Sequence, residues 1–236
     1  MKTLIIIPAY NEELNIKRVV DNLTANYPQY DYVVINDGSK DNTAMICYEN
    51  NYNIIDLPVN LGLAGGFQAG LKYAHHLDYD YAIQFDADGQ HRPEYIEPIV
   101  AKMAEGYDIV IGSRFVDQKK PISLRMLGSF FISTAIKMTT FKKIKDPTSG
   151  MRMLNKKMIK EFALNTNYGP ETDTISYLIK NGAKVAEVQA EMDERIEGQS
   201  YLTLSRSISY MLRMVMSIMF IQSFRKRDKK HISNEE

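Results

Sequence analysis

The stretch TLIIIPAYNEELNIKRVVDNL, from Thr3 to Leu23, decides the fold class. Its first part, TLIIIPAY, is a short continuous apolar run closed by a proline, which is typical of a central parallel strand covered on both faces. In the second part Asn11 is expected to cap a helix, with Glu12 and Glu13 in its first turn. The apolar residues of that helix recur at helical spacing, at Ile16, Val19, Val20 and Leu23. A buried strand followed by an amphipathic helix is the repeating unit of α/β proteins.

The same unit recurs over the first 113 residues. Apolar runs predict further strands at 31–37, 53–58, 79–85 and 107–113, and helical patterns fall at 39–51, 64–76 and 92–106. Asp41 is expected to cap the first of these helices, and Pro93 suits the first turn of the last. The alternation predicts an α/β fold built on a single Rossmann-like, doubly wound, mostly parallel sheet. Beyond it, the chain predicts helices at 123–141, 155–164 and 171–182 and a final strand at 183–192.

Composition excludes several classes of protein. The 236 residues suffice for one well-buried domain, and 44% apolar with 25% charged residues is ordinary globular composition. Lys plus Arg equals Asp plus Glu at 29 each, so we expect no nucleic-acid partner. The single cysteine, Cys47, excludes a disulfide within the chain and is expected to be a buried structural thiol. The first apolar run is too short for a signal peptide, and no run of about 18 apolar residues exists to span a membrane, so we expect a cytoplasmic protein.

Two carboxylates follow the fourth predicted strand in the motif FDADGQH, at Asp86 and Asp88. Alternation along an extended chain would point both to the same side, which suits a hard cation such as Mg²⁺ or Mn²⁺. The alternative is a solvated turn in which Asp88 and Gly89 merely end the strand. Gln90 and His91 could add a neutral ligand, although a lone histidine in a loop is more often exposed.

Other polar loops follow the remaining strands, at the edge where α/β sheets bind ligands. Asp37, at the end of the second strand, could accept a hydrogen bond from a nucleobase or a ribose hydroxyl, or it could simply belong to a turn and helix cap. The glycine-rich run at 60–70 precedes a helix but lacks the spacing of a Walker loop. Its glycines indicate close approach of the backbone to a ligand or to the sheet.

Six ordered motifs carry a family resemblance: IIIPAYNEE, VVINDGSKDNT, NLGLAGGFQAGL, FDADGQHRPE, GSRF and DPTSGMRML. In order and spacing they resemble the family 2 glycosyltransferases of the GT-A fold, and most of all the dolichyl-phosphate mannose synthase and polyprenyl-phosphate glycosyltransferase branch. The likeness covers about residues 3–200. It implies a GT-A domain at 1–200, divided into a nucleotide-sugar half (1–113) and an acceptor half (114–200), followed by an amphipathic helix and basic tail at 201–236.

The resemblance also implies roles for single residues. It places the donor nucleotide against Pro8, Ala9, Tyr10, Glu12 and Asp37, with Glu12 and Asp37 at the base or ribose. It assigns the divalent metal that bridges the donor diphosphate to Asp86 and Asp88, with Gln90 nearby and Ala87 at the donor. It makes Ser113 and Arg114 a phosphate-side pair, and Arg195 of ERIEGQS a clamp over a donor or acceptor phosphate. One departure is Asn36, where the family commonly has aspartate, which leaves the choice of nucleotide open.

These roles fit a transfer reaction in which a nucleoside diphosphate leaves. The metal, with Arg114 or Arg195, would stabilise the negative charge that develops on the leaving group. A hydroxyl acceptor needs a general base, for which Glu171 and Asp173 are the candidates; the alternative is that both merely compensate the charge of a helix N-terminus. An acceptor phosphate is already ionised and needs no strong base.

The C-terminal segment bears on the acceptor. One helical stripe carries apolar residues at Ile208, Met211, Leu212, Val215, Ile218 and Met219, and the basic run RKRDKK follows at 225–230. This pattern favours a helix on an anionic membrane surface, with the protein peripheral at the inner face of the membrane. The alternative is a helix packed on the domain or in a homo-oligomer, since core helices have the same pattern. The apolar part, residues 214–224, is too short to cross a bilayer.

Together these observations predict an inverting, metal-dependent glycosyltransferase that uses a UDP- or GDP-sugar, Mg²⁺ or Mn²⁺, and a polyprenyl phosphate or membrane-linked glycan acceptor. Two alternatives remain: transfer to a polysaccharide hydroxyl, and a nucleotide-sugar-binding subunit without turnover. The intact carboxylates and arginines argue against the second.

Overall fold

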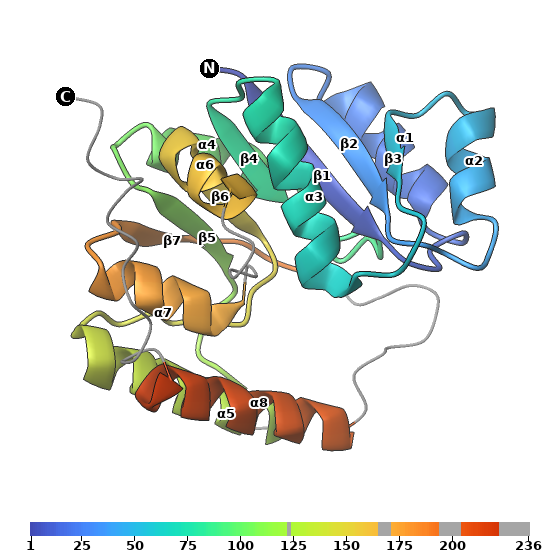
Figure 1. Cartoon of the computed structure of the whole chain (residues 1–236). Coiled ribbons are helices and arrows are strands. Elements are labelled where there is room, and N and C mark those ends of the chain that lie inside the picture. The colour runs from blue at the N-terminus through green and yellow to red at the C-terminus, as the bar shows by residue number, and fades with distance from the viewer. Residues whose placement is uncertain (122–123, 165–170, 194–203, 222–236) are drawn as a thin grey trace.

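The computed structural model describes residues 1–121, 124–164, 171–193 and 204–221, and these form one sheet with helices on both faces (Figure 1). The strands are β1 (Thr3–Ala9), β2 (Asp31–Asn36), β3 (Ile54–Asp56), β4 (Tyr81–Gln84), β5 (Ile109–Ser113), β6 (Arg152–Asn155) and β7 (Val185–Gln189). The helices are α1 (Ile16–Asn26), α2 (Thr43–Glu49), α3 (Gly62–His76), α4 (Ile96–Met103), α5 (Leu124–Thr140), α6 (Lys156–Leu164), α7 (Thr172–Lys180) and α8 (Leu204–Met219). A short 3-10 turn, Pro93–Tyr95, leads into α4.

The sheet has the strand order β3-β2-β1-β4-β6-β5-β7. β6 pairs antiparallel with both β4 and β5, and the other pairs are parallel. The predicted doubly wound, mostly parallel sheet is therefore confirmed. Because β6 runs in reverse, its amino end lies at the same edge as the carboxyl ends of the other strands, and this edge gathers the loops that carry the motifs.

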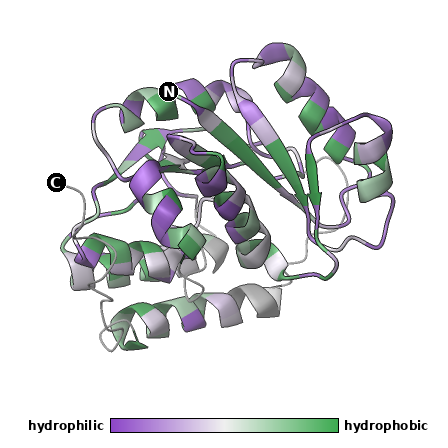
Figure 2. Ribbon diagram, turned by 45° about the horizontal axis from the view of Figure 1, so that its top comes forward, coloured by the Kyte–Doolittle hydropathy of each residue, from purple (hydrophilic) through white to green (hydrophobic). Residues whose placement is uncertain are grey.

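Each face of the sheet has its own apolar core. Alternate residues of β1 point to opposite sides: Leu4 and Ile6 pack against α3 and α6, and Ile5 and Ile7 pack against α1 and α4. In Figure 2 the central strands are mainly hydrophobic in colour, whereas the helices carry polar stripes. Cys47 of α2 lies in the second core, where burial raises the pKa of its thiol to about 11, so the expected structural thiol is confirmed.

A further helical layer lies below α7, where α5 and α8 run side by side (Figure 1). Met214 and Ile218 of α8 are buried in the same core as α7 and the sheet, and the bare backbone of Gly128 on α5 makes room for Met211. The sequence pattern gave packing on the domain as the alternative for the C-terminal helix, and this packing is confirmed for α8. None of the described helices is long and apolar enough to cross a membrane.

Some local predictions were wrong. Asn11 does not cap α1, and Glu12 and Glu13 do not lie in its first turn, because the helix begins only at Ile16. Asn11 has a left-handed backbone (φ 56°), and its side chain accepts a hydrogen bond from the N–H of Lys40 (2.8 Å). Leu212 does not lie on the buried stripe of α8 but is 62% exposed, because the helix buries Met214 and Ser217 instead. The N-cap residue of α2 is Asn42 and not the predicted Asp41, although the Asp41 carboxylate accepts from the N–H of Thr43, the first residue of α2 (3.0 Å).

Candidate active site

The loops after β1 and β2 are joined to each other by hydrogen bonds. The N–H of Asn11 donates to Ser39 Oγ (2.9 Å), and the N–H of Glu12 donates to Thr43 Oγ1 (2.9 Å). Glu12 is buried, and its carboxylate accepts from the side-chain amide of Asn15 (2.9 Å). The motif AYNEE therefore forms one fixed wall with the motif NDGSKDNT.

Asp37 lies behind this wall and is 3% exposed. Its carboxylate accepts from the N–H of Leu61 (2.7 Å) at the start of α3, and Gly66 of α3 passes close to its side chain. Burial raises the pKa of Asp37, although the backbone hydrogen bonds of Leu61 and Gly62 oppose the shift. A charge at Asp37 is therefore costly in the folded protein, which is typical of a group kept for its function.

Asn36, the departure from the family pattern, has a structural partner. Its side-chain amide donates to Asp56 Oδ1 (2.7 Å) at the end of β3, and the residue is 2% exposed. An aspartate at this position would put two carboxylates in contact. The amide is therefore matched to Asp56, a partner 20 residues away.

Four other residues that the resemblance assigns to the donor also lie at this edge. Pro8 and Tyr10 are half-buried, and Ala9 is buried at the end of β1. Ala87 is 2% exposed and belongs to the core beneath the sheet edge.

Asp86 and Asp88 flank the buried Ala87 and are both partly exposed. Asp86 Oδ1 accepts from the side-chain amide of Gln84 (3.0 Å), and Asp88 Oδ1 accepts from the N–H of Gln90 (3.0 Å). Gly89 takes a left-handed conformation (φ 78°), and any side chain there would collide with the guanidinium of Arg18. The turn therefore presents two oriented carboxylates with a cation behind them.

The donor set of this turn fits Mg²⁺ or Mn²⁺. Two hard carboxylate oxygens leave most coordination positions for phosphate oxygens and water, as these ions prefer. Among the described residues no group of three Asp, Glu, His or Cys side chains lies together as a metal site, so the donor diphosphate would have to complete the shell. Gln90 is adjacent; its amide nitrogen donates to the carbonyl of Asp193 (3.1 Å), and its amide oxygen is the atom that could bind a metal.

The end of β5 carries an ion pair that sequence reasoning missed. Arg114 makes a fork to Asp146, with Nε to Oδ2 at 2.7 Å and Nη2 to Oδ1 at 2.9 Å. Asp146 is fully buried; burial alone would raise the pKa of its carboxyl, but the hydrogen bonds and charge of Arg114 outweigh it and lower the pKa. Ser113 is fully buried, with its hydroxyl accepting from the N–H of Phe115 (3.4 Å). A phosphate role for Ser113 and Arg114 stays a prediction.

A second cation, Lys120, lies next to this pair. Arg114 and Lys120 both face the ring of Phe115, at 5.2 and 5.4 Å from its centroid. Lys120 Nζ donates to the buried hydroxyl of Ser129 on α5 (3.0 Å), and burial lowers the pKa of Lys120. The basic side chains that follow β5 therefore extend as far as α5.

Arg152 is a buried cation that the sequence analysis did not single out. It begins β6 at 6% exposure and donates from Nη2 to the carbonyl of Pro147 (2.8 Å). Burial lowers the pKa of Arg152, while Tyr210, Asp146, Asp86 and Glu171 raise it by their charge. The signal for it was an arginine within the otherwise apolar strand MRML.

The two candidate bases lie at the start of α7 and contact α8. Asp173 is 7% exposed, and its Oδ2 accepts from Ser217 Oγ (2.6 Å). Glu171 has a side chain 35% exposed, with Oε1 at 3.8 Å from Arg213 Nη2. The C-terminal helix is therefore a wall of the candidate site, which its sequence pattern did not indicate. Arg195 lies outside the described residues.

The six motifs of the resemblance thus meet at one edge of the sheet. A match to the family described as "Glycosyl transferase family 2" spans residues 4–162, more than half of the chain. The chain belongs to the family 2 glycosyltransferases.

Relatives of this glycosyltransferase have named activities. It is 32% identical to the dolichol-phosphate mannosyltransferase of Pyrococcus furiosus over 232 residues, which are 93% of this chain and 64% of the relative. It is 32% identical to the UDP-N-acetylglucosamine–dolichyl-phosphate N-acetylglucosaminyltransferase of Methanococcus voltae, covering 78% of this chain and 82% of the relative. It is 27% identical to the polyprenol monophosphomannose synthase of Mycolicibacterium smegmatis, covering 86% and 81%.

A solved structure supports the fold of this glycosyltransferase. Glucosyl-3-phosphoglycerate synthase from Mycobacterium tuberculosis, in a complex with Mn²⁺, UDP and phosphoglyceric acid, superimposes with a TM-score of 0.68 at 15% identity. The match covers 96% of this chain and 80% of the other. The predicted GT-A fold is therefore confirmed.

Proposed function

We propose that this glycosyltransferase moves a sugar, with inversion, from a UDP- or GDP-sugar to a polyprenyl phosphate at the inner surface of a membrane, using Mg²⁺ or Mn²⁺. The observation that carries the proposal is the apolar outer face of the α5–α8 layer, together with Lys120, which follows β5 and contacts α5 through Ser129. The named activities of the relatives support the same acceptor class.

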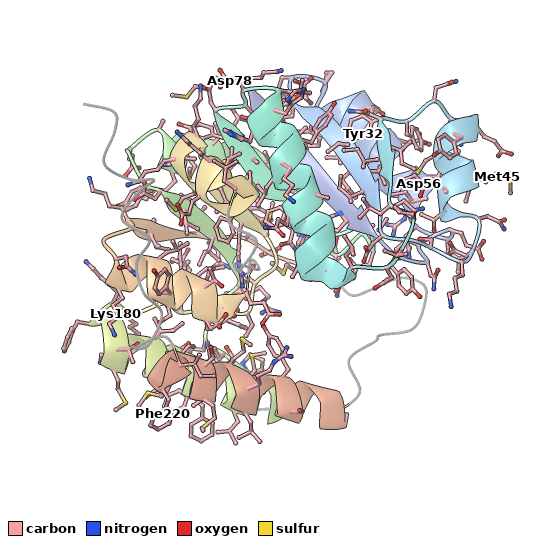
Figure 3. All side chains as sticks on the ribbon, viewed as in Figure 1. Tyr32, Met45, Asp56, Asp78, Lys180 and Phe220 are labelled. Atoms are coloured by element: carbon pink, nitrogen blue, oxygen red, sulfur yellow. The ribbon has the colours of Figure 1, made fainter. Side chains whose placement is uncertain are left out.

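The outer face of α5 and α8 exposes large apolar side chains, several of them aromatic. They are more than half exposed at Leu127, Phe130, Phe131 and Met138 of α5, at Leu212 and Met216 of α8, and at Phe141, Phe220 and Ile221 directly after these helices. Phe220 marks the lower rim of the molecule in Figure 3. A contiguous apolar patch is typical of a surface that contacts a membrane or another protein, and the basic run at 225–230 in the sequence favours an anionic membrane. A homo-oligomer through α8 is the competing occupant.

The surroundings of the two candidate bases favour an acceptor that is already ionised. Asp173 is buried and accepts a hydrogen bond from Ser217, and Glu171 lies 3.8 Å from Arg213, so each carboxylate has a side chain of α8 beside it. A hydroxyl acceptor would need one of them as a general base. A phosphate acceptor needs none, and Arg114 and Lys120 would orient it at the end of β5.

Each part of the transfer reaction can be assigned to residues of this chain. Glu12 and Asp37 would hold the nucleoside, and Asp86 and Asp88 would hold the divalent ion, which neutralises the charge that develops on the departing diphosphate. Arg114 and Lys120 would place the acceptor oxygen for attack on the opposite face of the anomeric carbon. The oxygen–carbon bond forms as the bond to the diphosphate breaks, and the diphosphate keeps the electron pair.

The test is a transfer assay with purified protein, Mn²⁺, radiolabelled UDP- and GDP-sugars, and polyprenyl phosphate in detergent. We expect label to enter the organic phase with one donor class, and to remain aqueous when the lipid lacks its phosphate. Label that enters only a water-soluble glycan would favour the polysaccharide alternative. Nucleotide binding without consumption of any donor would favour a subunit without turnover.

The membrane contact gives a separate prediction. Replacing Phe130 and Phe131 together by serine should lower binding to vesicles with an anionic lipid at least about tenfold, since burying one such side chain contributes about 1.5–3 kcal/mol. Tyr48→Ser, which removes a 56% exposed aromatic ring from α2, is the matched control and should bind as before. Vesicle co-sedimentation measures this. Unchanged binding of the double variant, with a smaller oligomer in solution, would instead assign the face to a second copy of the chain.

The raised pKa of Asp37 gives another prediction. Asp37→Asn should bind UDP or GDP about 10- to 100-fold more weakly, because a hydrogen bond to a charged group contributes about 1.5–3 kcal/mol. Its free energy of unfolding at pH 7 should be equal to or above that of the wild type, since the amide can still accept from Leu61 and no charge is buried.

The sign of this effect with pH is fixed by the direction of the shift. A folded pKa above the unfolded one penalises the wild type at neutral pH, and the penalty disappears as the pH falls through the folded pKa. The stability advantage of Asp37→Asn should therefore shrink in acid. Urea unfolding at pH 7 and at pH 4 measures it, and a variant markedly less stable than the wild type at pH 7 would contradict the prediction.

A further inference from the structure

We propose that His91 is a positioning residue for the metal ligand Asp86, and that a brace between residues 90–92 and 191–193 holds His91 in place. The inference rests on the proposed role of Asp86 in binding the donor metal. His91 itself contacts no donor atom in this scheme and acts through Asp86.

Both ring nitrogens of His91 lie against Asp86. The residue is 4% exposed, contrary to what a lone histidine in a loop suggests. Its Nδ1 accepts the backbone N–H of Asp86 (2.9 Å), so in the neutral ring the proton lies on Nε2. Nε2 faces Asp86 Oδ2 at 3.4 Å, while Gln84 donates to the other oxygen, Oδ1 (3.0 Å). The carboxylate is thus oriented by one side chain at each oxygen.

The surroundings of the His91 ring leave it little freedom. The ring of Phe85 meets it edge to face at 5.5 Å between centroids. On the other side lies Gly150, where a Cβ atom would come within 2.9 Å of Asp86 Oδ2 and 3.4 Å of the His91 ring. A glycine at this point of the loop before β6 is what allows the carboxylate and the imidazole to occupy the same space.

The brace fixes the backbone that carries His91. His91 forms a β-bridge with Met192, and the N–H of Asp193 donates to the carbonyl of Gln90 (2.9 Å). Arg92 donates to Asp193 Oδ1 from Nε (2.8 Å) and from Nη2 (2.6 Å), and to Glu191 from Nη1 (2.8 Å). Chain segments 101 residues apart are therefore joined by backbone pairing and by a charged fork.

This arrangement has the form of an outer shell around a metal site. Partners that orient a metal-binding carboxylate typically change metal affinity about 10- to 100-fold when they are removed. The Arg92 pairs are partly exposed, and each such surface pair contributes only about 0–1 kcal/mol to stability. Their removal should therefore change the affinity for the metal more than the free energy of unfolding.

The experiment measures Mn²⁺ binding, by electron paramagnetic resonance of free Mn²⁺ in the presence of UDP or GDP, for His91→Ala and His91→Asn. We expect affinity about 10- to 100-fold lower for His91→Ala. His91→Asn should recover part of it, because its amide oxygen can accept the N–H of Asp86. His76→Ala, an exposed histidine at the far end of α3, is the control and should leave affinity unchanged.

Arg92→Ala, Asp193→Ala and the double variant test the brace without touching the ring. Each single variant should weaken Mn²⁺ binding several-fold. The double variant should lose no more than Arg92→Ala alone, because that substitution already removes the pairs of Arg92 with both Asp193 and Glu191. Thermal unfolding with EDTA confirms that all variants are folded.

Wild-type affinity in His91→Ala would overturn the inference while leaving the proposed function intact, and additive losses in the Arg92 and Asp193 variants would overturn the brace. A wild-type protein that binds neither nucleotide with Mn²⁺ would overturn both the inference and the proposed function.

Discussion

Replacing Asp88 by asparagine is expected to lower sugar transfer by about 100- to 1000-fold, the range seen when one group that stabilises developing charge is removed from an active site. The side chain keeps its shape and can still accept from the N–H of Gln90, so the turn should stay intact. What changes is the charge available to the divalent ion. Initial rates with a radiolabelled donor measure the effect, and nucleotide binding should lose its dependence on Mn²⁺.

The matched control for Asp88 is Asp78→Asn. Asp78 is also a loop aspartate, but it lies at the amino edge of the sheet, paired with Lys156 on the surface (Figure 3). Its replacement should leave the rate within about twofold, since an exposed pair contributes little. Full activity of Asp88→Asn would remove the basis of the metal site.

The second large effect is on stability and concerns the pair of Arg114 and Asp146. Asp146→Ala should lower the free energy of unfolding at pH 7 by about 3–5 kcal/mol, the usual cost of removing one partner from a buried ion pair. Arg114 is 23% exposed in its side chain, so water can reach part of the freed charge and the lower end of that range is expected. Urea unfolding measures the loss.

The pH dependence of this pair follows from the lowered pKa of Asp146. A folded pKa below the unfolded value gives stability that is present above the unfolded pKa and is lost as the pH falls through the folded pKa. The wild type should therefore lose this contribution in acid, below about pH 4. The free energy of unfolding of Asp146→Ala should lack this part of the decrease at acid pH. Equal unfolding free energies of the two proteins at pH 7 would show that the pair does not stabilise the fold.

The sequence predicted the fold through short-range patterns. Runs such as LIIIP and YAIQF have the composition of buried strands whatever surrounds them, and the helices between them carry their own periodicity. The position of Asp86 and Asp88 at a ligand-binding edge followed from strand direction alone. These features depend on neighbours within one element, so they can be inferred without the fold.

The features that sequence reasoning missed depend on distant partners. The side chain of Asn11 bonds to the backbone of Lys40 and so does not cap the helix, and His91 is buried where it pairs with Met192. Asp146 faces Arg114 across 32 residues. A polar residue in a loop has the same appearance in the sequence whether it meets water or a counter-charge, and only the folded chain decides which.

The reversal of β6 places the start of this strand at the edge where β4 and β5 end. A strand of four residues is about 13 Å long, so a parallel β6 would begin at the opposite edge, at least that far from Asp86. Running in reverse, it lets the loop that follows α5 enter β6 beside Asp86, at the edge where β5 ends. Gly150, in the loop before β6, and Arg152, the first residue of β6, thus lie at the edge that carries Asp86, and insertions in the loop at 141–150 would alter the surroundings of that carboxylate directly.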